Sequence, residues 1–292
     1  MEFDANRRLF VGLATLDIIL GVDLFPSGNE KVVATREAIV AGGPAANAAV
    51  TSAFLGKTSV LVSGIGQSSL GTQILSELTG RGVSVVDMDA DRSESPPVAA
   101  IVVTLSTGDR AVISPGAVAS QVRAGRDLSA LVAASGAVLI DGHHPQLATE
   151  AVRIARESGV HSILDGGSWK PQTDALLQYI DFAICSDDFQ PPKYRKEYVL
   201  EYLIKRGVKY AAVTRGARSI LWASGSKRGE VPVPTWDVVD TLGAGDVFHG
   251  AFVSEIPHGP VSTEAFVSAL AFAGSIASKS CGSFGTRAWM DQ

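Results

Sequence analysis

The stretch with the clearest capacity for chemistry places three small residues directly before a carboxylate. Gly243, Ala244 and Gly245 precede Asp246, and an apolar run typical of a buried helix follows them. N–H groups in the first turn of a helix have no partner within the helix, and small side chains let a ligand come close to them. Since a helix N-terminus also carries partial positive charge, this turn predicts a binding site for an anion such as phosphate.

Asp246 itself has two interpretations. As a general base, it would accept the proton of a hydroxyl that attacks the anion bound beside it. As a helix cap, a frequent position for aspartate, it would satisfy backbone N–H groups and do no chemistry. This stretch alone favours the helix cap, so the elements around it have to decide.

A second candidate is the double glycine Gly42-Gly43, which opens a predicted helix of small residues that runs to about Leu55. Pro44 suits the first turn of that helix. Asn47 lies three residues further on and can direct its amide toward a ligand, and its mediocre helix propensity favours a specific role. Close packing of the two glycines, without a ligand, is the alternative.

Polar residues follow several predicted strands, which lie at residues 8–14, 137–140, 161–164, 182–184 and 210–213 with predicted helices between the later ones. This alternation predicts an α/β fold, in which the carboxyl ends of parallel strands form one ligand-binding rim. We therefore expect these polar residues to converge. They are Asp17, Asp141, Asp165, Ser186, Asp187 and Thr214. Asp17 is a candidate for binding hydroxyl groups, with an ordinary turn aspartate as the alternative.

Two β-rich segments interrupt this alternation and predict a small separate sheet that acts as a lid. One spans residues 17–40, and the other, 97–114, contains a hairpin with Arg110 near its turn. The remaining residues, 1–16, 41–96 and 115–292, then form the α/β core. Arg110 could reach a sugar hydroxyl or a phosphate, although a solvated surface arginine has the same local sequence.

Composition excludes some classes of function. The chain has 292 residues, is 46% hydrophobic and carries a formal net charge of -5, so it has no basic field for nucleic acid or for an anionic membrane. We expect a cytoplasmic protein, because no signal-type segment or run of 18 apolar residues is found. The adjacent histidines His143 and His144 would point in different directions, which argues against a shared metal ion.

Taken together, these motifs resemble the PfkB, or ribokinase-like, carbohydrate kinase family across nearly the whole chain. The run from Asp240 to Phe248 resembles the C-terminal signature Asp-Thr-x-Gly-Ala-Gly-Asp-x-Phe, and Gly42-Gly43 with Asn47 resembles the N-terminal signature. The resemblance implies a three-layer α/β/α fold with a mostly parallel central sheet and a small β-sheet lid. It also implies a homodimer formed through the lid.

The resemblance further implies ATP-dependent phosphorylation of a hydroxyl of a small sugar, with Mg²⁺ bridging the ATP phosphates. Asp246 would be the base, and the N–H groups of residues 243–245 the anion hole. Substrate-binding positions would be Asp17, Asn29, Gly42, Gly43, Asn47 and Arg110. Nucleotide-binding positions would be Ser186, Asp187, Thr214 and Gly216. Asp240 matches a position that holds a monovalent cation, usually K⁺.

Departures from the family pattern bear on the substrate. Where many relatives have Asn-x-x-Glu, this chain has Ser186-Asp-Asp-Phe189, and the serine resembles the ketohexokinase-like and sulfofructose-kinase-like branches. Asn29 and Pro44 replace groups that ketohexokinases use on their sugar, and His143 stands where sulfosugar kinases have an arginine. Neither fructose nor a sulfonate is therefore favoured. A nucleoside kinase and a catalytically silent binding protein of the same fold are the alternatives.

Overall fold

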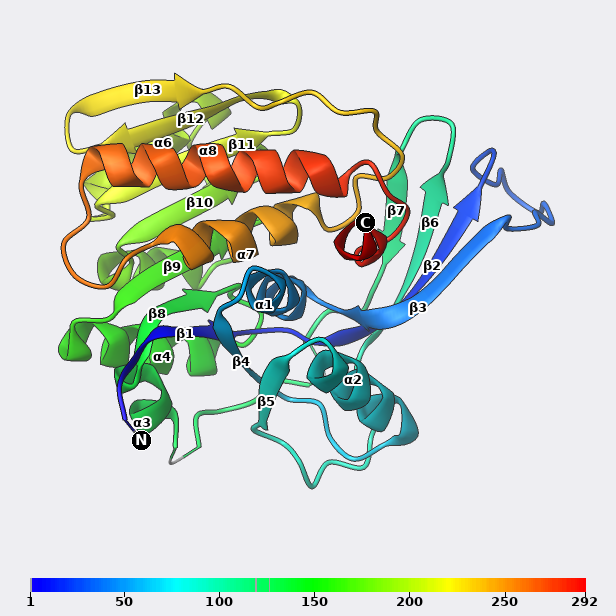
Figure 1. Ribbon diagram of the computed structural model, residues 1–292, viewed down its shortest axis with the longest axis horizontal. Helices are drawn as coiled ribbons and strands as arrows, with labels where there is room; N and C mark the ends of the chain where they lie inside the picture. Colours follow the sequence, from blue (N-terminus) through cyan, green and yellow to red (C-terminus); the bar gives the residue numbers. More distant parts are fainter. Residues whose placement is uncertain (1, 119, 126) are drawn as a thin grey trace.

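The computed structural model describes residues 2–118, 120–125 and 127–292, and these form two sheets flanked by helices (Figure 1). The large sheet has the strand order β13-β12-β11-β10-β9-β8-β1-β4-β5, and the strands from β11 to β5 pair in parallel. Its strands are β1 Asp4–Val11, β4 Thr58–Ser63, β5 Val83–Asp87, β8 Ser135–Ile140, β9 His161–Gly166, β10 Phe182–Ser186, β11 Tyr210–Arg215, β12 Arg218–Ser224 and β13 Lys227–Val231.

Helices cover both faces of this sheet. In Figure 1, α1, α2, α7 and α8 lie on the near face, and α3, α4 and α6 lie behind it; α5 packs into the same core cluster as these three helices. Their bounds are α1 Pro44–Phe54, α2 Ser69–Gly80, α3 Leu128–Ala133, α4 Pro145–Ser158, α5 Thr173–Leu176, α6 Val199–Lys205, α7 Ala244–Glu255 and α8 Thr263–Ser280, with short 3-10 turns η1 Leu177–Tyr179, η2 Lys196–Tyr198 and η3 Ala288–Asp291.

The central strands are unbroken apolar runs because both of their faces are buried. In β1, Phe10 packs into the cluster under α1, α7 and α8, while Leu9 and Val11 pack into the cluster under α3, α4 and α6. Successive side chains on a strand point to opposite faces, so one strand supplies both cores. The predicted three-layer α/β/α fold, with a mostly parallel sheet and a small separate sheet, is confirmed.

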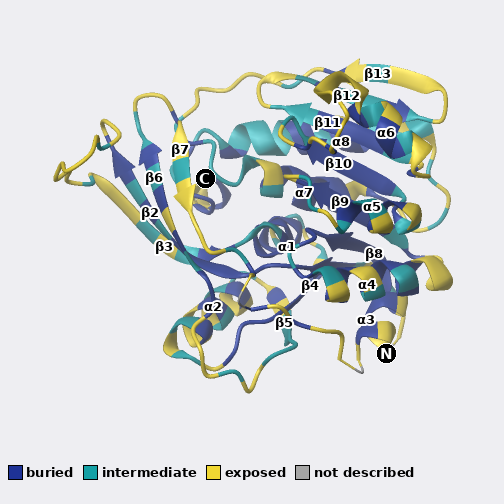
Figure 2. Cartoon of the chain, turned by 180° about the vertical axis from the view of Figure 1, so that it is seen from behind, coloured by how far each residue is buried: buried dark blue, intermediate teal, exposed yellow. Residues whose placement is uncertain are grey.

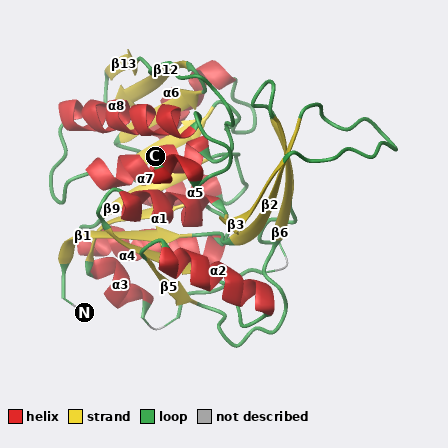
Figure 3. Cartoon of the chain, turned by 45° about the vertical axis from the view of Figure 1, so that its right-hand side comes forward, coloured by secondary structure: helices red, strands yellow, loops and turns green. Residues whose placement is uncertain are grey.

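The small sheet has the order β3-β2-β6-β7 and stands at one end of the large sheet (Figure 3). Its strands are β2 Thr15–Val22, β3 Arg36–Gly42, β6 Val98–Thr104 and β7 Arg110–Ile113. The expected hairpin is the antiparallel pair of β6 and β7. Division of the chain into a core and a lid stays a proposal, and β2 and β3 each extend two residues beyond the lid ranges expected from the sequence.

The two faces of the small sheet differ. On the inner face, Ile19, Ile101 and Val103 are buried. They pack with Leu242, which lies just before α7, and with Phe284, which follows α8. On the outer face, a row of cross-strand neighbours runs from Ile39 through Ile18 and Ala100 to Ile113. Exposed residues on β3 and β7 are visible from behind (Figure 2).

The position of Asp17 corrects the expectation that it follows the first strand directly. β1 ends at Val11, and Asp17 is the third residue of β2 in the small sheet. The chain leaves the large sheet at Gly12, where a Cβ atom would lie 2.2 Å from the Asp141 carboxylate. That carboxylate accepts the N–H of Leu13 at 2.8 Å, which fixes the bend.

In residues 2–118, 120–125 and 127–292, no helix has both the length and the apolar character that a membrane-spanning segment requires.

Candidate active site

The turn before α7 has a shape that only glycine adopts easily. Gly243 is the N-cap of α7 with φ of 71°, and a Cβ atom there would lie 2.7 Å from Cγ2 of Thr286. The helix begins at Ala244, which makes Asp246 its third residue. Asp246 is therefore not the N-cap, and no side-chain cap is formed at this helix.

The first turn of α7 presents backbone donors to open space. The N–H of Ala244 bonds to the carbonyl of Thr241 at 3.3 Å, whereas the helix itself offers no acceptor to the N–H groups of Gly245 and Asp246. A Cβ atom at Gly245 would meet nothing within 4 Å, and φ there is not positive. Neither packing nor backbone conformation accounts for this glycine, so the space beside it is available to a ligand.

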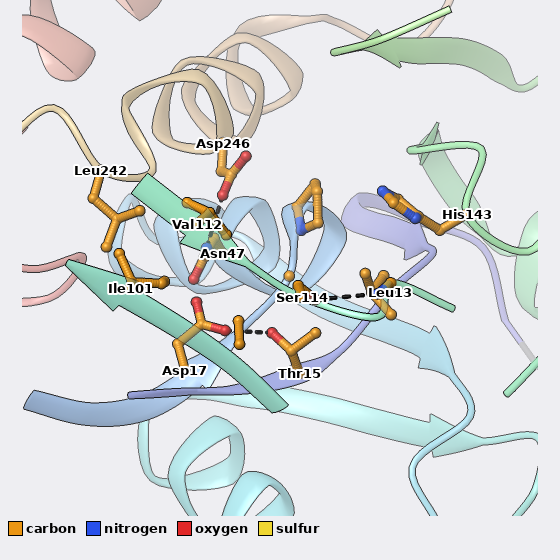
Figure 4. A pocket seen from close by; sticks show the side chains of 14 residues that line it. Leu13, Thr15, Asp17, Asn47, Ile101, Val112, Ser114, His143, Leu242 and Asp246 are labelled. Atoms are coloured by element: carbon orange, nitrogen blue, oxygen red, sulfur yellow. Dashed lines mark hydrogen bonds between the residues drawn. The ribbon is translucent and has the colours of Figure 1, made fainter. Parts of the chain in front are cut away.

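A pocket of about 310 Å³ lies on one side of this turn, between the small sheet and α1 (Figure 4). Its polar lining includes Thr15, Asp17, Asn47, His143 and Asp246. Its apolar lining includes Leu13, Pro44, Ala99, Ile101, Val112 and Leu242. Figure 4 shows Asp246 and Asn47 facing one another, with Asp17 below them. We call this the smaller pocket.

A second pocket, of about 480 Å³, lies on the other side of the turn. We call it the larger pocket. Its polar lining includes Arg110, Ser186, Asp187, Asp188, Thr214 and Gly216. Its apolar lining includes Ile220, Val233, Trp236, Phe248, Gly274 and Ala277. Small residues of α8 and broad apolar side chains leave room for a flat ring, with polar groups at one end.

The first turn of α7 separates the two pockets. Asp246 and Leu242 line the smaller pocket, and Ala244 and Gly245 line the larger one. One helix N-terminus therefore places a carboxylate on one side and backbone donors on the other, within a single turn.

Asp246 is held by a neighbouring amide. Its Oδ2 accepts a hydrogen bond from Nδ2 of Asn47 at 2.7 Å. Burial raises the pKa of Asp246 to about 7, and the Asp165 carboxylate adds to the rise, while Asn47 and His249 oppose it. A carboxyl group with a pKa near neutrality is suited to accept a proton at physiological pH.

Asp17 needs the adjacent glycine. A Cβ atom at Gly42 would lie 1.9 Å from Oδ2 of Asp17, so a side chain at residue 42 would displace the carboxylate. Oδ1 of Asp17 accepts the hydroxyl of Thr15 at 2.5 Å. Burial raises the pKa of Asp17, and the Thr15 hydrogen bond opposes the rise. Gly43, with φ of 95°, is the N-cap of α1 and lets that helix start beside Leu13.

The predicted site residues lie in four places: the two pockets, the turns beside them and one exposed loop. The smaller pocket contains Asp17, Gly43, Asn47 and Asp246. The larger pocket contains Arg110, Ser186, Asp187, Thr214, Gly216, Ala244 and Gly245. Gly42, Asp240 and Gly243 line neither pocket but support the turns beside them. Asn29 is exposed in the loop between β2 and β3 and lines neither pocket. Arg110, expected at the substrate, lies instead among the residues expected at the nucleotide.

Asp240 joins two segments of the chain. Its carboxylate accepts the N–H of Leu242 and the N–H of Gly285, both at 2.8 Å. The turn before α7 is thereby connected to the segment after α8.

Sequence patterns missed two residues of this site. Thr15 holds Asp17. His143, which the sequence places where sulfosugar kinases have an arginine, lines the smaller pocket. Arg287 is buried and donates to Oδ1 of Asn47 at 2.8 Å. An arginine near the end of the chain carries no local signal of burial, because its partners come from α1 and α2.

Carboxylates at the larger pocket are the candidates there for holding a metal ion. Across the described ranges, no group of three or more His, Cys, Asp or Glu residues is arranged to hold a metal ion. At the larger pocket, Asp187 pairs with Arg218 at 3.1 Å and with Lys196 at 3.7 Å, and Asp188 is exposed. Asp187 is therefore occupied by two cationic side chains, and the exposed carboxylate of Asp188 is the ligand type that would suit a Mg²⁺ ion arriving with a nucleotide.

A model of the family described as pfkB family carbohydrate kinase matches residues 6–292. The chain therefore belongs to the pfkB family of carbohydrate kinases. The predicted family and the predicted class of enzyme, an ATP-dependent carbohydrate kinase, are confirmed.

Similar proteins include several ribokinases. Ribokinase of Bacillus subtilis is 27% identical over 285 residues, covering 96% of this chain and 94% of that protein. The structure of Arabidopsis thaliana ribokinase complexed with ribose and ATP has a TM-score of 0.77 at 25% identity, covering 98% of this chain and 94% of that one. Giardia lamblia ribokinase has a TM-score of 0.83 at 17% identity, covering 97% and 95%, and supports the fold. The expected nearness to the ketohexokinase-like and sulfofructose-kinase-like branches is not confirmed.

Removing the ionisable group at residue 246 is expected to change stability in a pH-dependent way. The pKa of Asp246 rises on folding from 3.8 to about 7, so the folded protein loses stability as the pH rises through this range. Asn cannot ionise, and its carbonyl still accepts the Asn47 amide. Asp246→Asn should therefore stabilise the protein by about 4 kcal/mol at pH 8 and by about 2 kcal/mol at pH 5, measured by urea unfolding. An equal difference at both pH values would contradict a raised pKa.

Proposed function

We propose that this protein transfers the γ-phosphoryl group of ATP to a hydroxyl of a small, uncharged sugar or sugar derivative. The observation that carries the proposal is the first turn of α7, which separates two pockets and contributes to both. The smaller pocket takes the sugar and the larger pocket takes ATP. Asp246 is the proposed base, and the N-terminus of α7 is the proposed anion hole.

The proposed reaction follows from this arrangement. The acceptor hydroxyl gives its proton to Asp246, its oxygen forms a bond to the γ-phosphorus, and the bond from that phosphorus to the bridging oxygen of ADP breaks. Negative charge on the phosphoryl oxygens is stabilised by the N–H groups and dipole of α7. Mg²⁺ bound with the nucleotide would neutralise further charge. Asp187 and Asp188 are the aspartates of the larger pocket, and carboxylate oxygens are ligands that Mg²⁺ prefers.

The charge of the smaller pocket favours a neutral acceptor. Asp17 and Asp246 both line it, and His143 is the basic side chain among its lining residues. A phosphate or sulfonate on the substrate would meet two carboxylates and little compensating charge. The similarity to ribokinases, one of which is solved with ribose and ATP, makes ribose the first substrate to test.

Turnover by a panel of acceptors tests the proposed function. Purified protein with MgATP is expected to release ADP with at least one neutral pentose or ketose, and Asp246→Asn should reduce kcat by about 10²- to 10⁴-fold. Adenosine in the panel tests the nucleoside alternative. Repeating the assay in choline chloride instead of potassium chloride tests the proposed monovalent cation near Asp240. ATP and sugar binding without any turnover, or full turnover by Asp246→Asn, would contradict the proposal.

Substitution of Gly245 is expected to change kcat without lowering the stability of the fold. Because space beside it is open and its φ is not positive, Gly245→Ala should keep or slightly raise the melting temperature. The added methyl group would occupy the proposed phosphoryl site, so kcat should fall at least tenfold. Gly243→Ala is the matched variant: it should lower stability, since φ is 71° and Thr286 is in the way. Unchanged kcat in Gly245→Ala would contradict an anion hole at this turn.

The small sheet is proposed to act as a lid over both pockets. Arg110 donates to the hydroxyl of Thr241 at 2.8 Å, and that hydroxyl donates to the carbonyl of Gly108 at 3.0 Å. The hairpin of the small sheet is thus hydrogen-bonded to the residues just before the anion-binding turn. Binding of the two substrates and position of the lid would be coupled through this contact.

A homodimer through the outer face of the small sheet completes the proposal. Ile39 and Ile113 belong to the apolar cross-strand row and are 46% and 73% exposed. Sedimentation velocity at micromolar concentration should show a dimer, and the double variant Ile39→Glu, Ile113→Glu should shift it to monomer. Tyr198→Glu, at a residue that is 47% exposed on η2, is the control and should remain dimeric. A monomeric wild-type protein would contradict this interface.

A further inference from the structure

Four side chains from separate parts of the chain form a continuous hydrogen-bonded series that ends at Asp246. Glu77 of α2 accepts Nε of Arg287 at 3.1 Å. Nη1 of Arg287 donates to Oδ1 of Asn47 at 2.8 Å, and Nδ2 of Asn47 donates to Oδ2 of Asp246 at 2.7 Å. Arg287 is 6% exposed, so its guanidinium is almost completely removed from water.

The series fixes which way round the Asn47 amide lies. A guanidinium can only donate hydrogen bonds, so the group of Asn47 that faces Arg287 must be the carbonyl oxygen. The NH₂ group then faces Asp246, where it stabilises the ionised carboxylate. If the amide turned over, two donors would face each other at Arg287 and two acceptors would face each other at Asp246. Both contacts would be repulsive.

Arg287 also has structural contacts that a test must separate from this effect. Its Nη2 donates to the carbonyl of Ala41 at 2.6 Å. Oε2 of Glu77 accepts the N–H of Ala41. The Glu77–Arg287 pair therefore holds both polar groups of Ala41, directly before Gly42 and Gly43. A variant that only weakens this pair would disturb packing without reversing the Asn47 amide.

We propose that Arg287 is a positioning residue for the proposed phosphoryl transfer, and that it acts by fixing Asn47 as a hydrogen-bond donor to the base. Oδ2 of Asp246 is thereby occupied, and Oδ1 is left to receive the proton of the substrate hydroxyl. Because Asn47 uses its oxygen on Arg287, its second N–H can only donate, so it selects a substrate group that accepts a hydrogen bond. This proposal rests on the proposed function, in which Asp246 is the base.

Several other charged groups face the two ends of the series. Asp165 on β9, His249 on α7 and Asp17 on β2 act on Asp246, and Asp17 and Arg81 act on Arg287 together with Glu77. These groups are unchanged in the variants below, except for Glu77 in the control. Arg287 also lowers the pKa of Asp17 and Glu77 raises it, so a shift of the acid limb is assigned to the series only where Asn47→Asp shifts the limb as well.

The test compares Arg287→Met with Arg287→Lys and with the control Glu77→Gln. Arg287→Met should reduce kcat/KM at least tenfold and move the acid limb of its pH profile upward by about one pH unit, since Asn47 is no longer held with its NH₂ group toward Asp246 and stabilises the charged form of the base less. Arg287→Lys keeps a cation and should recover part of both effects. Glu77→Gln weakens the buried ion pair without contacting Asn47, so it should lower the melting temperature and leave the acid limb in place.

Asn47→Asp tests the series even if the Arg287 variants are unstable. Aspartate keeps an acceptor for Arg287 but replaces the amide donor to Asp246 with a second carboxylate, so the folded protein should be retained and the acid limb should move upward by more than in Arg287→Met. An unshifted limb in Asn47→Asp, or in Arg287→Met with only a lower melting temperature, would overturn the proposal and leave Arg287 a purely structural residue. If Asp246→Asn were fully active, the proposed function itself would fail, which distinguishes the two results.

Discussion

A half-buried carboxylate in the first turn of a helix is the constraint on which the site depends. Asp246 carries negative charge at the positive end of α7, yet it is partly removed from water and lies near two other carboxylates, Asp165 and Asp17. Burial and repulsion favour its protonated form, while the helix end and the Asn47 amide favour the ionised form. The balance brings its pKa to about 7, so a small change in any neighbour alters the fraction that can accept a proton.

Residues 285–287, which follow α8, stabilise this arrangement through three contacts. Asp240 binds the N–H of Gly285, Thr286 packs against Gly243, and Arg287 reaches Asn47. Three successive residues of one segment thus contact the turn, the N-cap and the hydrogen-bond partner of Asp246. The small sheet adds a contact from the opposite side through Arg110 and Thr241. The two pockets are therefore assembled from segments that are far apart in sequence, and neither exists without the turn between them.

The sequence predicted those features that depend on local patterns. Parallel strands were predictable because burial on both faces makes them unbroken apolar runs, and Gly42-Gly43 and Gly243 to Gly245 were predictable because close approach needs small residues. The bend at Gly12 was not predictable, because the apolar run continues through Ala14 and the bend is fixed by Asp141 from another strand. The burial of Arg287 and the pocket that Arg110 lines depend on partners from distant segments, which no local pattern encodes.

The rate of the chemical step as a function of pH tests the central claim most directly. In single turnovers followed by rapid quench, phosphoryl transfer to the accepted sugar should increase about tenfold per pH unit below pH 7 and become constant above it. In Asp246→Asn the same step should be slower by about 10²- to 10⁴-fold and nearly independent of pH. A pH-independent wild-type rate between pH 5 and 8, or the same pH dependence in Asp246→Asn, would contradict the assignment of Asp246 as the base.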